Sequence, residues 1–312
     1  MKIVVTGALG HIGSQLIRSL PETFPGAEII MLDNLSTQRF CSLFNLPAQG
    51  RYRFREADIL TADLEELFAG ALTVVHLAAI TNAEGSFDIQ EKVEQTNFIG
   101  TERVARACAS VGAPLLFLST TSVYGTQAAV VDEQCAPHEL KPQSPYAESK
   151  LRAEQLLAQV GQEQRLRFII CRFGTIFGAS VGMRFHTAVN KFIWQACMGI
   201  PLTVWTSALD QQRPYLDLSD AVRAIEFIIG NDLFDGNIYN VLTINATVRQ
   251  VIDTVREFIP DARVKLVDHR IMNQLSYAVA CEKFRSLGFT FKGDLHKRVA
   301  ESIDILRGAC SW

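Results

Sequence analysis

The sequence lacks the features by which a membrane protein, a secreted protein or a zinc protein is usually identified. No apolar run in its 312 residues approaches the length of a membrane span. The first apolar segment already ends at Gly7, which is too short for the apolar region of a signal peptide. Seven cysteines are scattered without a CxxC pair, so we expect reduced thiols and no metal site. These absences predict a soluble protein of the cytoplasm.

Strong net charge is also absent. Lysine and arginine nearly balance aspartate and glutamate, which leaves a net charge of −3 and no long basic run. We therefore expect neither nucleic acid nor a membrane as the main partner. The apolar share of 48% and the charged share of 20% are typical of a folded protein. The length is enough for one large domain or for two closely joined ones.

What the sequence does contain begins at its first residues. Lys2–Thr6 is an apolar, β-branched run typical of a buried strand, and Gly7–Gly13 follows with glycines three residues apart. The next segment, Ser14–Leu20, has helical periodicity. Glycines at these positions allow a tight turn and close approach of the backbone to a pyrophosphate, while the helix N-terminus offers free N–H groups. Strand, glycine turn and helix in this order predict a dinucleotide site.

A carboxylate stands where such a site needs one. Glu28–Leu32 is the next predicted strand, and Asp33 ends it, about 20 residues after Gly13. A carboxylate there binds the adenine ribose hydroxyls and repels the 2′-phosphate of NADP, so we expect NAD as the cofactor. Arg39 lies nearby in the sequence and softens this preference.

Strand-like and helical segments continue to alternate along the chain, which predicts a parallel, doubly wound Rossmann sheet of the α/β class. Ligands of such sheets lie outside the carboxyl ends of the strands. The further predicted strands are Tyr52–Arg55, Leu72–Leu77, Leu115–Ser119 and Leu166–Cys171, and the helices are Ala62–Phe68, Ile89–Ser110, Tyr146–Val160 and Phe185–Gly199.

One stretch carries the candidate chemistry. Tyr146 and Lys150 are four residues apart, which on a helix puts both side chains on one face. A phenol loses its proton near pH 10, and a fixed ammonium nearby lowers that pKa. The pair then exchanges a proton with an alcohol, while a hydroxyl at the end of the preceding strand holds the reacting oxygen. Thr120 is our choice for that hydroxyl, with Ser119 and Ser122 as alternatives.

With these residues in view, the chain resembles the extended short-chain dehydrogenases/reductases, in the group of UDP-galactose 4-epimerase and other NAD-dependent nucleotide-sugar epimerases and dehydratases. The resemblance covers most of the chain and is specific for the superfamily, though not for one substrate. The matching segments, in order, are Gly7–Gly13, Asp33–Ser36, Asp58-Ile59, His76–Ala79, Asn97, Ser119–Gly125, Tyr146–Lys150, Arg172–Thr175, Arg213–Tyr215 and Tyr239–Val241.

The resemblance implies roles for individual residues. Tyr146 becomes the acid/base, Lys150 holds the cofactor ribose and lowers the pKa of the phenol, and Thr120 bonds the reacting hydroxyl. The implied cofactor-binding residues are Gly7, Gly10, His11, Ile12, Gly13, Asp33, Asn34, Asp58, Ile59, Leu77, Ala78, Ala79, Thr81, Asn97, Ser119, Tyr146, Lys150 and Phe173. The implied substrate-binding residues are Thr120, Thr121, Thr175, Asn190 and Arg213. His76 lies in an apolar strand, and we expect a core residue there rather than a catalyst.

The resemblance also implies the organisation of the chain. We assign residues 1–174 to the NAD-binding domain and 175–312 to a smaller, mixed α/β lobe that binds a nucleotide-diphosphate sugar, with segments returning to the main sheet. Members of the group commonly dimerise through two helices per subunit. The helices Ile89–Ser110 and Tyr146–Val160 are therefore expected to form a homodimer interface.

Departures from the family pattern narrow the reaction. Thr121-Ser122 stands where the 4,6-dehydratases carry an Asp-Glu pair, and GDP-mannose 3,5-epimerases have a cysteine in place of Ser122. Thr175 replaces a common asparagine, which puts the usual pose of a UDP-hexose in doubt. Ser276–Val279 occupies a segment that often carries a diphosphate-binding arginine, for which Arg270 or Arg285 is a possible substitute.

Three functions remain open from the sequence. The first is an NAD-dependent nucleotide-sugar epimerase that oxidises a sugar hydroxyl to a ketone and returns the hydride to the other face. The second is an NAD(P)H-dependent nucleotide-4-keto-6-deoxysugar reductase, which uses the same residues once. The third is a non-catalytic NAD-sensing regulatory protein, against which the retained Tyr146 and Lys150 speak.

Overall fold

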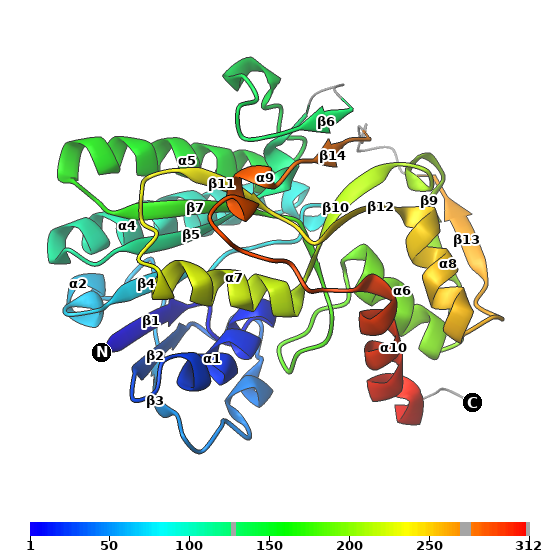
Figure 1. The fold of residues 1–312 in the computed structure, drawn as a ribbon, viewed down its shortest axis with the longest axis horizontal. Helices are drawn as coiled ribbons and strands as arrows, with labels where there is room; N and C mark the ends of the chain where they lie inside the picture. Colours follow the sequence, from blue (N-terminus) through cyan, green and yellow to red (C-terminus); the bar gives the residue numbers. More distant parts are fainter. Residues whose placement is uncertain (126–128, 269–275, 310–312) are drawn as a thin grey trace.

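A seven-stranded parallel sheet organises the molecule (Figure 1). The computed structural model describes residues 1–125, 129–268 and 276–309. The strands of this sheet are β1 (Lys2–Thr6), β2 (Glu28–Asp33), β3 (Arg51–Glu56), β4 (Thr73–His76), β5 (Leu115–Thr120), β7 (Phe168–Phe173) and β11 (Ile238–Val241). Their order is β11-β7-β5-β4-β1-β2-β3, so the chain moves outward from β1 first in one direction and then in the other. The predicted Rossmann fold is confirmed, with its switch point between β1 and β4.

Alternating side chains of the strands fill two hydrophobic cores, one on each face of the sheet. Ile3 and Val5 lie in the core that includes residues of α1 (His11–Thr23) and α7 (Leu218–Gly230). Val4 lies in the other core. Its helices are α2 (Leu64–Phe68), α4 (Gly100–Val111) and α5 (Pro145–Gln164). Burial on both faces explains why the central strands are mainly apolar, whereas the edge strand β3 alternates charged and aromatic residues and is largely exposed.

The helix expected at Ile89–Ser110 is divided in the structure. It consists of α3 (Gln90–Val93), a π-helical turn over Glu94–Ile99, and α4. Gly112, with φ of 70°, ends α4 in the left-handed conformation that glycine adopts without strain. Single π-helical turns often occur at functional sites, and this one carries Asn97. The sequence pattern could not predict the extra residue of the turn, because the apolar spacing on both sides of it is helical.

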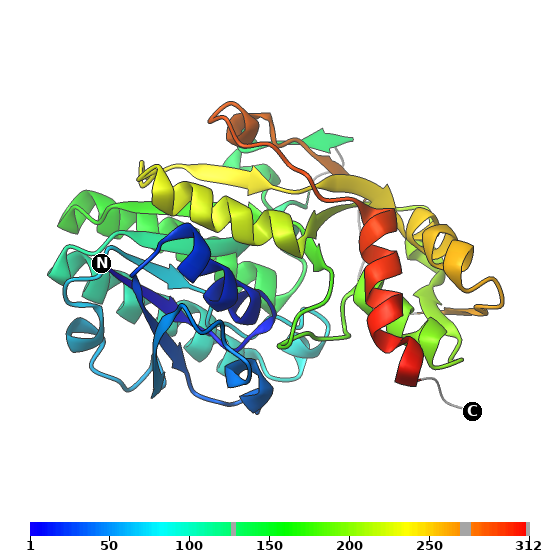
Figure 2. The same cartoon turned by 60° about the horizontal axis from the view of Figure 1, so that its bottom comes forward.

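A smaller lobe follows the main sheet and lies at its side in Figures 1 and 2. A third core holds it together. Its strands are β8 (Thr175–Phe177), β10 (Gln212–Asp217) and β12 (Ile244–Thr247) in one sheet, and β9 (Leu202–Trp205) and β13 (Val264–Val267) in another. Its helices are α6 (Ala188–Cys197), α8 (Val248–Phe258) and α10 (Leu295–Leu306). The helix expected at Phe185–Gly199 thus begins three residues later.

Several segments connect the lobe with the main sheet. β11 pairs with β7, and α7 packs against α1. The short strands β6 (Val130–Val131) and β14 (Ala278–Val279) pair beside α9 (Glu282–Arg285) at the top of Figure 1. The boundary that we expect at residue 174 falls between β7 and β8, and it stays a prediction.

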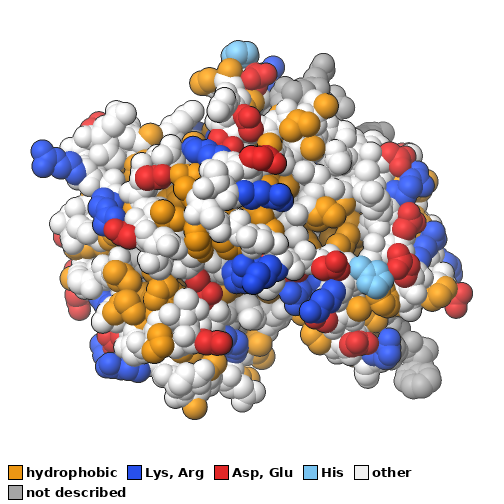
Figure 3. All heavy atoms as spheres, viewed as in Figure 1, with side chains coloured by type: hydrophobic (Ala, Val, Ile, Leu, Met, Phe, Trp, Pro, Cys, Tyr) orange, Lys and Arg blue, Asp and Glu red, His pale blue; other side chains and the backbone are white. Residues whose placement is uncertain are grey.

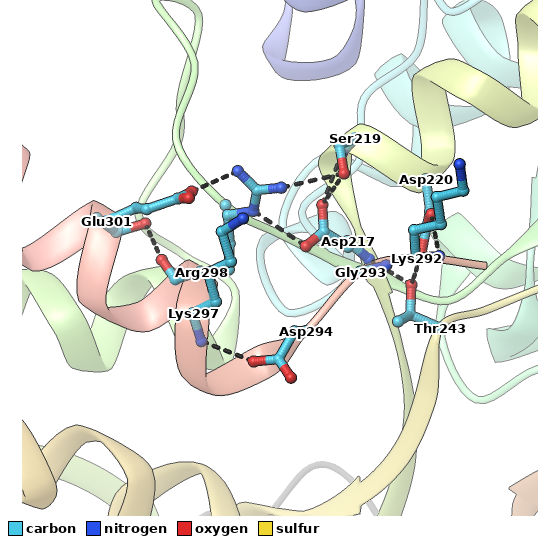
Figure 4. A network of polar contacts seen from close by, with 12 residues as sticks. Asp217, Ser219, Asp220, Thr243, Lys292, Gly293, Asp294, Lys297, Arg298 and Glu301 are labelled. Atoms are coloured by element: carbon cyan, nitrogen blue, oxygen red, sulfur yellow. Dashed lines mark hydrogen bonds and ion pairs between the residues drawn. The ribbon is translucent and has the colours of Figure 1, made fainter.

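Two buried carboxylates fasten α10 to the main body (Figure 4). Asp217 caps α7 and accepts from Arg298 Nε of α10 at 3.0 Å. Asp220 accepts from the backbone N–H groups of Lys292 and Gly293 at 2.9 and 2.8 Å, just before α10. Both side chains are fully buried. Because a buried charge must be paired, this network fixes where α10 begins.

The helices, the surface charge and the cysteines of the described residues bear on the expectations from the composition. In the described part of the chain no helix is long and apolar enough to cross a bilayer. Acidic and basic side chains are interspersed on the face drawn in Figure 3. The six described cysteines are free thiols, and the seventh, Cys310, lies outside the described residues.

Candidate active site

A cleft of about 1020 Å³ runs along the carboxyl ends of the central strands and into the smaller lobe. It is large enough for a dinucleotide or a similarly sized ligand. Of the residues that the sequence predicts for the site, all but Asn97 and Asn190 line this cleft. The ends of β1, β2, β4, β5 and β7 contribute to the lining, as expected for a doubly wound sheet.

The glycine turn fits a closely packed dinucleotide. Gly7 has φ of +65°, and a Cβ there would lie 2.6 Å from the backbone nitrogen of Ala78. A Cβ on Gly13 would lie 2.5 Å from the Gly7 carbonyl oxygen. Any side chain at either position would therefore push the helix or the next strand away. The first N–H groups of α1 have no partner within the helix, so they remain available to phosphate oxygens.

Asp33 keeps bonding capacity for a ribose. Its carboxylate accepts from the backbone N–H of Leu9 at 3.1 Å and of Leu35 at 3.0 Å. A carboxylate offers about four acceptor sites, so two of them stay free for hydroxyl donors. The Asp33 charge also counteracts the burial that lowers the pKa of Arg39. These residues fit NAD, with the arginine close to the carboxylate as its place in the sequence suggests.

Hydrogen bonds also order the turn after β3, where the resemblance implies the adenine. Asp58 accepts from Leu60 N at 2.9 Å and from the Asn34 amide at 3.0 Å. Ile59 is buried beneath Gly100, where a Cβ would approach its Cδ1 to 2.5 Å. The turn after β3 is thus rigid at the point where the resemblance implies an adenine.

The residues at the start of α5, the helix that carries Tyr146, strongly favour a helix N-terminus. Ser144 caps α5 by accepting from Ala147 N at 3.2 Å, and Pro145 occupies the first helical position. Tyr146 therefore lies in the first turn. The N-terminus of a helix favours negative charge, so the helix itself supports a phenolate there. Thr120 ends β5 and faces the same cleft, and it forms a hydrogen bond with Tyr146.

The pKa of Tyr146 departs from the expectation that Lys150 lowers it. Burial raises the pKa of the phenol, and the groups that oppose this are Arg184 and the hydrogen bond with Thr120. Lys150 Nζ instead donates to the Leu118 carbonyl at 2.8 Å. The spacing of four residues was therefore not sufficient to predict which cation acts on the phenol in this structure.

Lys150 occupies an apolar niche. Its side chain is 3% exposed, and Nζ lies 4.6 Å from the centroid of the Phe117 ring. Burial lowers its pKa to about 7, and the Glu154 carboxylate opposes this shift. Near neutral pH the lysine therefore exchanges between ammonium and amine.

His76 and Asn97 support the site from behind. His76 is fully buried between Thr6 Oγ1 at 2.7 Å and Thr101 Oγ1 at 3.1 Å, and burial lowers its pKa to about 3. The expectation that it is a core residue is confirmed. Asn97 lies outside the cleft lining, because its amide bonds both the N–H and the C=O of Ile80 and reaches Ser149 Oγ at 3.2 Å. It orders the chain beside Lys150 rather than contacting a cofactor.

One further prediction needs correction, and two hydroxyls beside Thr120 form bonds of their own. Asn190 is fully buried, with its oxygen accepting from Gly178 N at 3.1 Å, so it stabilises a loop and cannot reach a substrate phosphate. The Ser119 hydroxyl donates to Glu154, away from the reacting position. Thr121 donates to the Phe173 carbonyl at 3.3 Å, although it also lines the cleft. Thr120 is therefore the better placed of the neighbouring hydroxyls.

The glycine-turn helix is also joined to the segment after β8. His11 Nε2 lies 3.0 Å from the Gly178 carbonyl, and burial lowers the pKa of the imidazole to about 3. A neutral imidazole can bond a carbonyl only as a donor, so Nε2 carries the proton. Gly182 lies against the same turn, since a Cβ there would be 2.5 Å from the Leu9 carbonyl. The far side of the cofactor half is thus closed by residues of the second half of the chain.

The substrate side is lined by side chains from the smaller lobe. Arg213 enters the cleft from β10, bonds Gln211 Oε1 at 2.8 Å, and lies 5.5 Å from the ring centroid of Tyr277. Tyr277 donates to the Thr121 carbonyl at 3.1 Å. Of the two arginines considered as substitutes for a diphosphate ligand, Arg270 lies outside the described residues. Arg285 lies over the Phe291 ring, at 5.5 Å, and does not line the cleft.

One cation escaped the sequence analysis. Arg184, between β8 and α6, lines the cleft, and burial lowers its pKa to about 10. Besides burial, Tyr146 acts to raise the pKa of this guanidinium and Arg39 acts to lower it. His186 lines the cleft beside it. An arginine in an irregular loop has no characteristic spacing in the sequence. Only the fold could therefore show that Arg184 faces Tyr146.

Comparisons with known proteins agree with this geometry. A family model described as NAD dependent epimerase/dehydratase family matches residues 3–241. The uncharacterized UDP-glucose epimerase YtcB of Bacillus subtilis (strain 168) is 31% identical over 249 residues, which cover 77% of this chain and 76% of that protein.

Longer relatives share the same region. A trifunctional UDP-glucose 4,6-dehydratase/UDP-4-keto-6-deoxy-D-glucose 3,5-epimerase/UDP-4-keto-L-rhamnose-reductase of Arabidopsis thaliana is 28% identical over 320 residues, or 97% of this chain. That match covers 46% of the Arabidopsis protein, so the chain spans less than half the length of the first curated relatives that it matches.

Solved structures show the same fold. MoeE5 in complex with UDP-glucuronic acid and NAD has a TM-score of 0.86 and 26% identity, over 99% of this chain and 100% of that one. A UDP-glucuronic acid 4-epimerase from Bacillus cereus, in complex with UDP-glucuronic acid and NAD, has a TM-score of 0.88 at 24% identity, again over 99% and 100% of the chains.

Proposed function

The chain belongs to the NAD-dependent epimerase/dehydratase family, and within it we propose that this enzyme is a nucleotide-sugar epimerase. The observation that carries the proposal is the joint position of Thr120, Tyr146 and Lys150 at the end of β5 and the start of α5, in the cleft that fits NAD. The three side chains suffice to move one proton to and from a sugar hydroxyl. An epimerase that works through a ketone needs no other acid or base.

Each side chain has a defined task in this reaction. Tyr146 takes the proton of the sugar hydroxyl and later returns it, while Thr120 keeps that oxygen within bonding distance. Lys150 bonds the cofactor ribose and supplies positive charge when it is protonated. Bound NAD supplies the hydride acceptor, and the same hydride returns to the sugar. Inversion requires that the keto sugar turn over in the cleft before the hydride returns.

The residues of the site do not favour a dehydratase reaction, although several relatives are named dehydratases. Loss of water from a keto sugar needs an acid and a base beside the tyrosine. The segment after Thr120 offers Thr121 and Ser122, and the Thr121 hydroxyl is engaged with the Phe173 carbonyl. The carboxylates that line the cleft are Asp33, Asp58, Glu84 and Glu91, and all of them precede β5 in the sequence.

The cationic side chains suggest the kind of sugar. Arg213 is a forked donor suited to a diphosphate. Arg184 adds a second guanidinium at Tyr146, where the reacting sugar carbon must lie. A sugar with its own negative group, such as a uronic acid, would neutralise that buried charge. MoeE5, with which this chain shares 26% identity, binds UDP-glucuronic acid and also UDP-glucose, so the preference between the two sugars rests on Arg184. We therefore propose a UDP-hexose or, in preference, a UDP-hexuronic acid as substrate.

The test begins with the nucleotide that the purified protein carries. Denaturation should release NAD close to one per chain, because an epimerase regains its cofactor in each cycle. UDP-glucose and UDP-glucuronic acid are then incubated with the protein, and the configuration at C4 is followed by NMR. Epimerised product without added NADH supports the proposal. An empty protein that consumes NADH in reducing a nucleotide-4-keto-6-deoxysugar would replace it with the reductase function.

The dimer stays a separate proposal. The outward positions of α4 and α5 carry mainly polar side chains such as Arg106, Arg152 and Gln155, with half-buried apolar groups such as Leu151 of α5 and Phe98 of the π-helical turn beside them. Polar outward faces suit a modest interface between two copies of the chain. Sedimentation equilibrium at micromolar concentration should show a dimer, and a monomer under those conditions would remove the proposal.

A further inference from the structure

Lys150 depends on a neighbour that the reaction itself does not use. Its Nζ lies between the Leu118 carbonyl and the face of the Phe117 ring, in a niche where the side chain is 3% exposed. A carbonyl and an aromatic face both attract an ammonium, but together they do not replace the water that burial removes. An ammonium at this place therefore needs a nearby anion.

Glu154 is that anion. It follows Lys150 by four residues on α5, so both side chains leave the helix on the same side, one turn apart. The Glu154 side chain is 3% exposed, and Ser119 of β5 donates its hydroxyl to Oε1. The carboxylate thus joins the helix of Lys150 to the strand that carries Thr120.

Arg172 on β7 fixes the carboxylate from the other side. Its Nη2 donates to Oε2 at 2.6 Å and its Nε donates to Oε1 at 3.0 Å, which forms a fork of two parallel bonds. The Arg172 side chain is also 3% exposed. It donates further to Tyr124 Oη at 3.0 Å, and that hydroxyl donates to Asn240 Oδ1 at 2.9 Å. Strand β7, the turn after β5 and strand β11 therefore hold one carboxylate in place.

The titratable groups near Lys150 in the described part of the chain lie on α5, β4 and β7. Glu154 lies on its own helix, His76 on β4 is neutral near pH 7, and Tyr146 lies one turn earlier on α5. Arg172 on β7 is the remaining charge, and it acts beyond the carboxylate. Two buried cations thus share one buried anion. A pair that served stability alone could be replaced by apolar groups, as buried ion pairs often can.

We propose that Glu154, oriented by Arg172, is a positioning residue of the active site that holds Lys150 as an ammonium at the end of β5. The inference rests on the proposed function for the task of Lys150, while its geometry stands independently. In the substrate-free enzyme, burial lowers the pKa of Lys150 to about 7 despite the opposing carboxylate. Removal of Glu154 lowers that pKa further, so the ammonium persists only at lower pH.

The test uses a pair of variants, because Glu154→Gln alone leaves the Arg172 guanidinium buried without its anion. The double variant Glu154→Gln/Arg172→Gln removes both charges and leaves two amides, of which the first matches Glu154 in size and the second is shorter than Arg172. Glu163→Gln, at an exposed position near the end of the same helix, is the matched control. Thermal melting identifies which variants fold. The measured quantities are the affinity for NADH, from nicotinamide fluorescence, and the epimerisation rate, both between pH 5.5 and 9.

In the wild type and in Glu163→Gln, both quantities should fall together as the pH rises through the pKa of Lys150. In the double variant the midpoint should move down by about one pH unit, with roughly tenfold weaker NADH binding at pH 8. Glu154→Asp should restore the midpoint in part. A folded double variant with the wild-type midpoint would overturn the proposal and leave the pair a structural role. Because NADH binding needs no turnover, this outcome is distinct from a failure of the epimerase assignment.

Discussion

The two halves of the cleft are built by different means. The cofactor half consists largely of backbone at strand ends and at the start of α1, where a Cβ on Gly7 or Gly13 would lie 2.6 or 2.5 Å from the nearest backbone atom. The substrate half consists of side chains from separate segments, among them Arg184 before α6, Arg213 on β10 and Tyr277 before β14. A backbone site accepts few substitutions, whereas a side-chain site can change its ligand by single exchanges. The cofactor should therefore be the harder of the two ligands to change.

Tyr146 belongs to both halves, so its replacement should have the largest effect. Tyr146→Phe removes the only proton that the side chain can exchange and keeps the ring in place. We expect the epimerisation rate to fall by about 10²- to 10⁴-fold, as for loss of a general acid/base, with NAD content and melting temperature near those of the wild type. Rates are measured by NMR of the sugar and the NAD content by absorbance after denaturation. Undiminished turnover in Tyr146→Phe would refute both the epimerase and the reductase function.

The addition of a single methyl group should be enough to disrupt the cofactor half of the cleft. In Gly13→Ala the new Cβ would lie 2.5 and 2.6 Å from the carbonyl oxygens of Gly7 and Ala8, so α1 must move off the sheet. We expect loss of bound NAD together with about 1–3 kcal/mol of stability, the usual cost of overpacking. Gly26→Ala, where nothing lies within 4 Å but φ is +78°, controls for backbone strain alone. Retention of NAD in Gly13→Ala would show that the turn is less tightly packed than the distances indicate.

The same contrast explains what the sequence could and could not predict. Glycine spacing, the carboxylate after β2 and the four-residue spacing of Tyr146 and Lys150 are local signals, because each involves residues close together in the sequence. They predicted Gly7, Asp33 and Tyr146 at the cleft, where the structure has them. The sheet followed from the alternation of apolar strands and helices.

The errors of the sequence analysis arise where long-range contacts decide. Asn190 has the polarity of a ligand, but the fold places Gly178 and Arg184 on either side of its amide. Ser119 and Thr120 are neighbours with the same functional group, and only the position of Glu154 across from β5 distinguishes them. Arg184 lies 38 residues after Tyr146 in a loop without periodicity. Such relations depend on which segments meet, and no spacing in the sequence records that.

Arg184 offers the sharpest test of the substrate half. Arg184→Ala should raise KM for UDP-glucuronic acid by about 10- to 100-fold, the range for loss of a charge-assisted bond, and change KM for UDP-glucose much less. NAD content should stay at the wild-type level, since the glycine turn and Asp33 are untouched. Lys191→Ala, another cation of the cleft lining, is the matched control. Equal changes for both sugars would indicate a general role in the cleft, and loss of NAD would place the guanidinium on the cofactor diphosphate.

The pH dependence of stability should reveal the contribution of His76, which is buried behind the cofactor half of the cleft. Burial lowers the pKa of His76 from 6.5 to about 3. Its contribution is therefore complete above pH 6.5 and is lost as the pH falls toward 3, because the unfolded state binds a proton that the folded state refuses. Each such group makes the free energy of unfolding fall by about 1.4 kcal/mol per pH unit in that window. Urea denaturation from pH 4 to 7 should show this fall in the free energy of unfolding. In His76→Gln the slope should be smaller by about 1.4 kcal/mol per pH unit, which corresponds to one proton fewer taken up on unfolding. An unchanged slope would mean that His76 takes up a proton without unfolding.

The smallest effect is expected at Asn190, which the sequence placed among the ligands and the structure places in the core. Asn190→Ala leaves the Gly178 N–H without its acceptor and should cost about 1–3 kcal/mol of stability, measured by urea denaturation. Because Gly178 also holds His11 of α1 through its carbonyl, the loss is felt at the contact between the two halves of the cleft. The epimerisation rate at saturating substrate should stay within about twofold of the wild type, since the amide is fully buried and does not line the cleft. Asn190→Asp keeps the acceptor but buries a charge and loses the amide donor, so it should not restore the wild-type stability at neutral pH. A large rise in KM for every nucleotide sugar, without loss of stability, would instead return Asn190 to the substrate site and show that the loop before α6 rearranges when the cleft is filled.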